Sequence, residues 1–134
     1  PKPRSLFSGL RKHAADNIII FAARLDGEVI GRHLYVIDEP QATIHHWFSA
    51  VNKADFDHNP SEAIHDHAMR WAREAGFETY DFGPAPYDFR DGLFRYKREY
   101  GGDLHPIIAW ERGTSPLWPV YRFGRSFYRQ HINI

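Results

Sequence analysis

Residues 59–83, NPSEAIHDHAMRWAREAGFETYDFG, decide the fold because they join a helix directly to a strand. Apolar side chains recur there at i, i+4, i+7 and i+11, the spacing of one face of an α-helix. These are Ile64, Ala68, Trp71 and Ala75. Asn59-Pro60 suits the N-cap and first position of this helix, and Gly76 suits the residue after its end. The pattern predicts a helix over 60–75 and a strand over 77–82.

Three strands are expected before this helix. The apolar run after Asn17 predicts a strand over 17–25. Asp26-Gly27 is a two-residue hairpin signal, because a type I′ turn needs positive φ at both positions. The chain then returns over 28–38 and forms a third strand over 42–51. Alternation along the third strand places four side chains on one face. These are Ile44, His46, Phe48 and Ala50.

Helical or strand-like patterns also occur nearer the two ends. We expect short helices over 5–15 and 91–100, a strand over 104–111, and a C-terminal aromatic and basic helix over about 115–132. The order α-β-β-β-α-β-α-β-α predicts an α/β (α+β) fold, with a mixed, mostly antiparallel sheet flanked by helices. The helix over 60–75 crosses over that sheet.

The length and composition of the chain exclude several classes of functional site. The chain has 134 residues, a length that suits one domain over 1–134 with a core over about 5–111. It has no cysteine, which excludes disulfides, thiolate catalysis and Cys-ligated zinc. Its longest apolar run, Ile18–Ala23, is too short to span a bilayer, and its N-terminus does not resemble a signal peptide, so we expect a cytoplasmic protein.

The formal charge of zero hides an asymmetry. Residues 45–89 carry three basic and eight acidic side chains, whereas residues 90–134 carry eight basic and four acidic ones. Local fields decide which ligands a surface attracts. An anionic ligand is therefore expected near the basic, aromatic C-terminal third rather than near Asp55 and Asp57.

Two segments in the second half carry a family resemblance. Residues 70–83 are RWAREAGFETYDFG, and residues 92–101 are GLFRYKREYG. They resemble the C-terminal acyltransferase half of the FemAB-like family, part of the GNAT-like superfamily, which includes aminoacyl-tRNA-dependent transferases that build peptidoglycan bridges of the bacterial cell wall. Tyr80-Asp81-Phe82-Gly83 matches that family's strand motif. Tyr96–Gly101 matches its Phe-Lys-x-x-Phe-Gly helix motif, with Tyr for Phe twice.

The resemblance implies a GNAT-like fold and acyl or aminoacyl transfer to an amine by direct attack. Two departures are visible. Family members generally have two GNAT-like domains, so a second GNAT-like domain or a homo-oligomer is an expected partner. GNAT enzymes hold coenzyme A pyrophosphate on a glycine-containing loop, whereas residues 55–61 have no glycine and two acids. No tightly bound cofactor is expected, and aminoacyl-tRNA is favoured over acyl-CoA as the donor.

The resemblance places Lys97 at the substrate cleft, where its charge would stabilise an oxyanion. A solvated helix lysine is the alternative. Asp81 and His46 are candidate acid–base residues, although Asp81 could instead cap the next loop and His46 could be a hydrogen-bonded sheet histidine. Basic side chains among aromatic ones form a candidate substrate or tRNA surface, against the alternative of core aromatics with solvated cations. The candidate substrate-binding residues are Arg90, Arg95, Arg98, Tyr80, Tyr100 and Trp47.

No metal site is expected from the nine histidines. His45 and His46 point to opposite strand faces, and His65 and His67 lie about 200° apart around a helix. The C-terminal helix could bind a membrane surface or dock on a protein domain. Two further functions remain open beside FemAB-like transfer: a non-catalytic binding or oligomerisation module, and an acyl-CoA N-acetyltransferase.

Overall fold

The computed structural model describes residues 2–86, 88–108, 112 and 115–131. These fall into two compact units, Pro1–Gly101 and Gly102–Ile134. The first unit holds the sheet and three of the α-helices, and the second holds α4 (Trp118–His131). The expectation of one domain over 1–134 stays a prediction.

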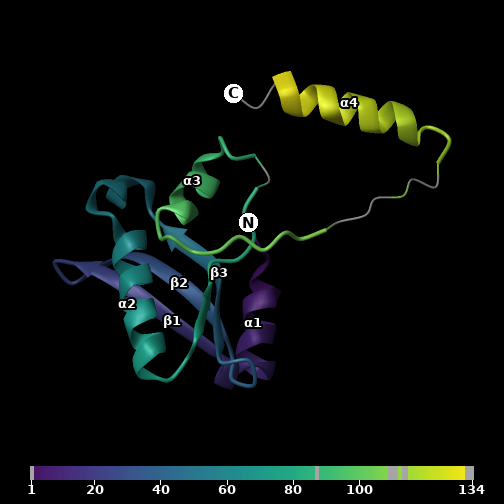
Figure 1. The fold of residues 1–134 in the computed structure, drawn as a ribbon. Coiled ribbons are helices and arrows are strands. Elements are labelled where there is room, and N and C mark those ends of the chain that lie inside the picture. Colours follow the sequence, from purple (N-terminus) through teal and green to yellow (C-terminus); the bar gives the residue numbers. More distant parts are fainter. Residues whose placement is uncertain (1, 87, 109–111, 113–114, 132–134) are drawn as a thin grey trace. The chain divides into compact units, whose positions relative to one another are not determined.

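The first unit is built on a four-stranded sheet in the order β1-β2-β3-β4 (Figure 1). Its strands are β1 (Ile18–Leu25), β2 (Glu28–Asp38), β3 (Thr43–Val51) and β4 (Thr79–Asp81). The first three pair antiparallel, and β4 pairs parallel to β3. The mixed, mostly antiparallel sheet flanked by helices is thus confirmed. Asp26 and Gly27 both have positive φ, at 50° and 87°, as the expected hairpin turn requires.

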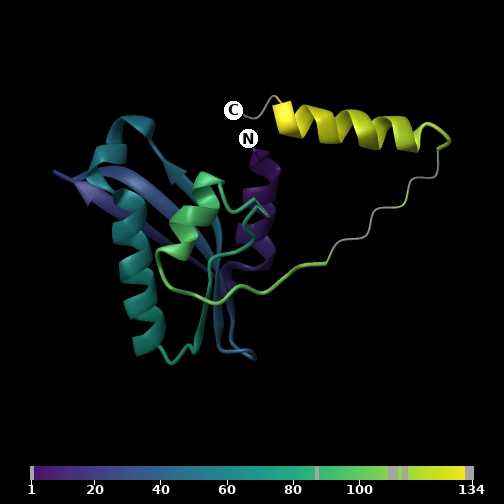
Figure 2. The same ribbon diagram turned by 45° about the horizontal axis from the view of Figure 1, so that its top comes forward.

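Helices cover both faces of this sheet (Figures 1 and 2). On one side lies α1 (Arg4–His13), whose Phe7 ring packs 5.7 Å from that of Phe48. On the other lies α2 (Pro60–Glu74), the crossover helix between β3 and β4. Its apolar stripe meets the sheet in a core that contains Tyr35 and Ile44, both fully buried. The remaining elements of this unit are η1 (Ala15–Asn17), η2 (Lys53–His58) and α3 (Gly92–Arg98).

A glycine lets α2 approach the sheet closely. A Cβ on Gly31 of β2 would lie 3.2 Å from Pro60 Cβ and 3.3 Å from both Ile64 Cδ1 and Val51 Cγ2. The first turn of α2 therefore rests on the β2 backbone, and a larger side chain at Gly31 would require its neighbours to shift by a few tenths of an ångström. This contact sets the height at which the rest of α2 faces the strands.

One local expectation was confirmed in position only, and another was wrong. Asn59 is the N-cap residue of α2 and Pro60 its first residue, as expected, but Asn59 adopts a left-handed conformation with φ 48° and ψ 48°, and its side chain makes no capping hydrogen bond. The η2 turn immediately before α2 imposes this conformation, which asparagine tolerates. A strand was expected over 104–111, but residues 104–108 form none, and residues 109–111 lie outside the described part. Pro106 lacks the N–H needed for a ladder hydrogen bond.

Among the described residues, no helix has both the length and the apolar character needed to cross a bilayer. The second unit contains α4 within the range expected for the C-terminal helix, and Arg122 on it is exposed. Membrane contact or docking through this helix stays a prediction.

Substitution of Ile44 by Ala should destabilise the first unit strongly, because this side chain is fully buried between the sheet and α2. Removal of such a side chain leaves a cavity and costs about 2–5 kcal/mol of unfolding free energy. Urea unfolding followed by circular dichroism measures the change. Ile20→Ala is the matched control, since Ile20 on β1 is 57% exposed and its loss should cost no more than about 1 kcal/mol.

Candidate functional site

Three histidines from separate elements meet between the sheet and α2. His33 lies on β2, His46 on β3 and His65 on α2. Their ring centroids lie 4.7–4.8 Å apart in all three pairs. His33 and His65 are almost fully buried, at 1% and 2% exposure, and His46 is half-buried. The sheet and the crossover helix thus bring together imidazoles that are far apart in the chain.

A β-bulge places the β3 residues of this site. Leu34 of β2 pairs with Phe48, but the next residue, Tyr35, pairs with His46, so Trp47 has no partner. The extra residue reverses the alternation beyond it. Phe48 therefore packs on Phe7 of α1, whereas Ser49 returns to the α2 face and its Oγ lies 2.9 Å from His46 Nε2. The expectation that His46 and Phe48 share a face was wrong for this reason.

Two tyrosine hydroxyls connect the buried histidines. The Tyr80 hydroxyl donates to the Tyr35 hydroxyl at 3.1 Å, and Tyr35 Oη lies 3.4 Å from His33 Nδ1. Tyr80 Oη also lies 2.6 Å from His65 Nδ1. Because the Tyr80 hydrogen is directed at Tyr35, Tyr80 must accept from the N–H of His65. The bridge therefore fixes the Nδ1 side of both imidazoles and directs each Nε2 elsewhere.

Burial keeps these rings uncharged. It lowers the pKa of His33 to about 4, with a smaller effect from His46. It lowers the pKa of His65 to about 3, helped by His33, His46 and Lys97. The pKa of His46 is lowered as well, first by burial and then by the positive charge of Lys97. Burial also raises the pKa of Tyr35 to about 12. At neutral pH the site thus contains neutral imidazoles, each of which has one ring nitrogen with a lone pair.

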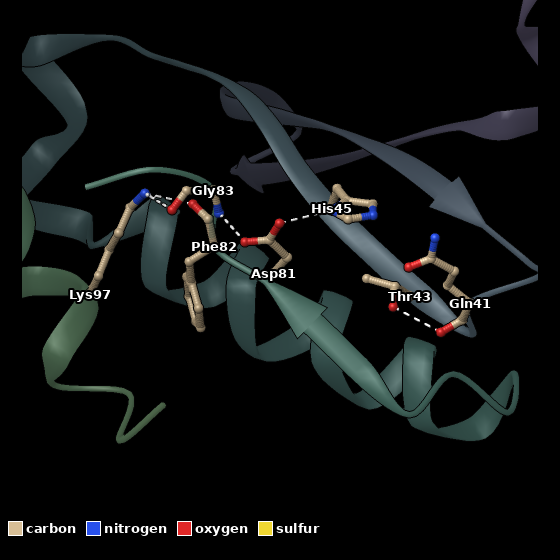
Figure 3. A network of polar contacts seen from close by, with 7 residues as sticks. All are labelled: Gln41, Thr43, His45, Asp81, Phe82, Gly83 and Lys97. Carbon is tan, nitrogen blue, oxygen red and sulfur yellow. Dashed lines mark hydrogen bonds and ion pairs between the residues drawn. The ribbon is translucent and has the colours of Figure 1, made fainter. Parts of the chain in front are cut away.

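Lys97 of α3 holds the backbone that follows β4 (Figure 3). Its Nζ donates to the carbonyl oxygens of Phe82, Gly83 and Pro84 at 2.6, 3.1 and 2.9 Å. An ammonium group has three N–H donors, so all three are engaged. Burial lowers the pKa of Lys97, partly offset by the nearby carboxylate of Asp81.

Asp81 lies on the opposite strand face from Tyr80 and pairs with His45 (Figure 3). His45 Nδ1 lies 2.8 Å from Asp81 Oδ2, and the Gly83 N–H donates to Asp81 Oδ1 at 2.7 Å. Burial raises the pKa of Asp81, but the hydrogen bonds from His45 and Gly83 outweigh it, and the pKa is below its usual value. Both carboxylate oxygens are thus engaged, and Asp81 caps the loop after β4.

A shallow depression lies beside the site. It measures about 220 Å³ and is lined by the end of β3, the η2 turn, the first turn of α2 and Tyr96 of α3. Glu62 supplies its carboxylate. The Tyr96 hydroxyl lies 2.9 Å from that of Tyr100, whose ring lies 5.6 Å from His65. A glutamate in this lining, beside neutral imidazoles, suits a cationic or amine ligand.

A family model described as an acetyltransferase (GNAT) domain matches residues 1–98. The chain belongs to this GNAT family. The mixed sheet of the structure agrees with that membership. No curated protein sequence matches the chain significantly.

Solved structures show the same fold for this GNAT domain at low sequence identity. An aminoglycoside acetyltransferase from an uncultured soil metagenomic sample, in complex with sisomicin, is 16% identical with a TM-score of 0.61, over 86% of this chain and 76% of that one. The aminoglycoside N-acetyltransferase AAC(6')-Iy in complex with CoA is 16% identical with a TM-score of 0.54, over 83% and 92%. A ribosomal-protein-alanine N-acetyltransferase from Brucella melitensis biovar Abortus 2308 is 13% identical with a TM-score of 0.58, over 84% and 81%.

The GNAT domain gathers only some of the residues that the sequence singled out. His46, Tyr80 and Tyr100 belong to the aromatic cluster around His65, and Lys97 and Asp81 meet at the loop after β4. The other candidates lie apart from the cluster. Trp47 packs on Phe48 at the bulge and is 46% exposed. The three candidate arginines, Arg90, Arg95 and Arg98, are exposed.

His33 and His65 were not predicted from the sequence to belong to the site. The alternation of His33 and Tyr35 on one strand face was a visible signal for the first. For His65 the signal was its place on α2 next to the apolar stripe, one residue after Ile64. Only the tertiary structure brings these two positions to His46.

Acidification should destabilise the GNAT domain through His33 and His65. In the unfolded chain a histidine takes up a proton near pH 6.5, whereas these two resist protonation down to about pH 4 and 3. The contribution of these two neutral histidines to the free energy of unfolding is therefore complete above pH 6.5, and it is lost as the pH falls toward their lowered pKa values. The loss is up to about 1.4 kcal/mol per pH unit for each group. Urea unfolding in metal-free buffer at pH 7 and 5.5 measures it, and equal stability at both would contradict it.

Substitution of Lys97 by Met should destabilise the domain by about 1–3 kcal/mol, because three backbone carbonyls lose a charged donor. Thermal and urea unfolding measure the effect. Arg98→Met is the matched control, since the adjacent Arg98 is exposed. Equal stability of the two variants would show that the carbonyls find other donors and that Lys97 does not hold the loop.

Proposed function

We propose that this GNAT domain transfers an acyl group to an amine acceptor, at the point where the pairing of β3 with β4 ends. The observation that carries the proposal is the position of His46. The two strands pair in parallel only from Thr43 with Thr79 to His45 with Asp81, and His46 is the first β3 residue beyond that pairing. An uncharged, half-buried imidazole just beyond the end of that pairing can receive a proton from a bound amine.

Direct attack needs few protein groups. The neutral amine nitrogen attacks the acyl carbon, and a new C–N bond forms while the carbonyl electrons move to oxygen. His46 takes a proton from that nitrogen. The C–O or C–S bond to the carrier then breaks, the carbonyl re-forms, and the imidazolium returns the proton to the leaving oxygen or sulfur. No protein nucleophile is required, which agrees with a chain that has no cysteine.

Lys97 contributes to the proposed reaction through its contacts with the loop after β4. Its three hydrogen bonds hold the Phe82–Pro84 backbone, and Gly83 lies so close to β3 that a Cβ on it would be 3.1 Å from the His46 carbonyl oxygen. Lys97 thus positions the wall that faces His46. Its charge also favours the negative charge that develops on the acyl oxygen.

Glu62 supports an amine as the acceptor. Glu62 lines the depression of about 220 Å³ beside Tyr96, and this carboxylate would attract an ammonium group before deprotonation. The similar aminoglycoside acetyltransferase was solved in complex with sisomicin. Polyamine and lysine-containing acceptors are therefore the first to test.

We further propose that the acyl donor is an aminoacyl-tRNA. The motifs Tyr80–Gly83 and Tyr96–Gly101 resemble those of FemAB-like transferases, which favours aminoacyl-tRNA as donor and a cell-wall peptide amine as acceptor. Before α2 the chain forms the η2 turn, which contains Asp55 and Asp57 and no glycine. These acids would repel a pyrophosphate. Acyl-CoA is the alternative donor, because the similar AAC(6')-Iy structure contains CoA.

The test supplies the full chain with a labelled aminoacyl-tRNA or with labelled acetyl-CoA. Acceptors are a lysine-containing cell-wall peptide and an aminoglycoside, and the readout is label on the acceptor. We expect transfer from aminoacyl-tRNA, and a loss of kcat of about 10²–10⁴-fold in His46→Gln. His58→Gln is the matched control, since His58 is exposed in the η2 turn.

Each outcome decides one part of the proposal. Transfer from acetyl-CoA alone would replace the FemAB-like donor by acyl-CoA. An unchanged rate in His46→Gln would remove His46 from the mechanism. No transfer from either donor would favour the binding or oligomerisation module.

A further inference from the structure

One feature of the histidine cluster is not needed for acyl transfer. His33 Nε2 is the single fully buried side-chain nitrogen or oxygen that lacks a hydrogen-bond partner among the described residues. A buried polar atom without a partner costs about 1–3 kcal/mol. His33 itself is 1% exposed, so solvent does not satisfy this nitrogen. A ligand that bonds to Nε2 would remove this cost.

The other two imidazoles converge on the same space. Each of the three rings offers one nitrogen, and these nitrogens all lie within 4.8 Å of one another. In a tetrahedral zinc site, with Zn–N bonds of about 2.0–2.1 Å, neighbouring nitrogens lie about 3.4 Å apart. Shifts of the nitrogens on the order of 1 Å would bring the cluster to that spacing. Three imidazoles are a known zinc donor set that leaves a fourth position open.

The tyrosine bridge has the form of a supporting shell. A metal-bound histidine usually makes a hydrogen bond through its other ring nitrogen, which fixes the ring. Here the Nδ1 atoms of His33 and His65 contact the Tyr35 and Tyr80 hydroxyls at 3.4 and 2.6 Å. Both Nε2 atoms are therefore left for a ligand. Because Tyr80 accepts from His65 Nδ1–H, the Nε2 of neutral His65 has a free lone pair.

We propose that His33, His46 and His65 form a binding site for one Zn²⁺ or a similar borderline divalent cation, held between β2, β3 and α2. The donors are nitrogen atoms only, which suits Zn²⁺, Co²⁺, Ni²⁺ and Cu²⁺ rather than Mg²⁺ or Ca²⁺. Binding displaces the ring proton from His33 Nε2, and that proton moves to Nδ1 or to solvent. Water or a substrate atom takes the fourth position.

The surrounding charges set the strength of the site. The Lys97 ammonium group lies near enough to lower the pKa of His46 and His65. Its positive charge would also repel the metal ion and weaken its binding. Asp81 has the opposite effect on His46. The low pKa values of His33 and His65 mean that protons do not compete for these nitrogens at neutral pH.

This inference does not rest on the proposed function. A zinc ion on His46 would occupy the lone pair that acyl transfer requires, so the metal would inhibit that reaction. Metal binding is measured without any enzymatic reaction, so its outcome does not depend on whether the chain is a transferase.

The experiment titrates the full, metal-free chain with Zn²⁺ alone by calorimetry, and with Co²⁺ alone by visible absorption. We expect one equivalent of Zn²⁺ and the strong d–d bands of a tetrahedral Co²⁺ site. Tyr80→Phe should weaken Zn²⁺ binding about 10–100-fold, because it removes a supporting hydrogen bond. His33→Gln and His46→Gln should weaken it by more than that. His58→Gln, which changes an exposed histidine, should bind as the unchanged chain does.

Folding of each variant is checked by near-UV circular dichroism. If His33→Gln does not fold, His46→Gln still tests the site, because His46 is only half-buried and its replacement should leave the domain folded. Absence of a stoichiometric Zn²⁺ site in the unchanged chain overturns the inference. So does a folded His46→Gln variant with undiminished affinity, or an equal loss in His58→Gln, which would indicate binding at surface histidines.

Discussion

The contact between Gly31 and the first turn of α2 sets the geometry of the first unit. Because no side chain separates them, Pro60 and Ile64 rest on the β2 backbone, and α2 lies low over the sheet. His33 lies two residues further along β2, on the same face, and His65 follows Ile64 on the helix. The close approach at Gly31 therefore brings the His33 and His65 rings to a centroid distance of 4.7 Å.

The layer formed this way is unusually polar for the interior of a small domain. Next to the apolar contacts of Tyr35, Ile44 and Ala68 lie three imidazoles and two linked hydroxyls. Polar groups in such a layer must be paired, because desolvation is costly. The tyrosine bridge and Ser49 pair most of them, and burial keeps the rings neutral. The orphaned His33 Nε2 is the exception, and its desolvation costs stability.

Sequence patterns were sufficient for the parts of the fold that local chemistry determines. The stripe from Ile64 to Ala75 predicted α2, and Asp26-Gly27 predicted the hairpin, since helix periodicity and turn φ angles depend on neighbouring residues only. The bulge at Trp47 was missed, because it arises from the register between β2 and β3 and not from β3 alone. His33 was missed for a similar reason. Its role depends on which helix covers β2 and at what height.

The histidine cluster also has a consequence for the continuity of the chain. Its three imidazoles come from β2, β3 and α2, and the rings packed around His65 include Tyr80 of β4 and Tyr96 and Tyr100 in and after α3. The shortest unbroken segment that contains them runs from His33 to Tyr100. No smaller fragment holds the cluster, and a cut within this segment separates its members. The hairpin at Asp26-Gly27 lies outside that segment, as does everything after Gly101, so the chain can be opened or extended there without dividing the site.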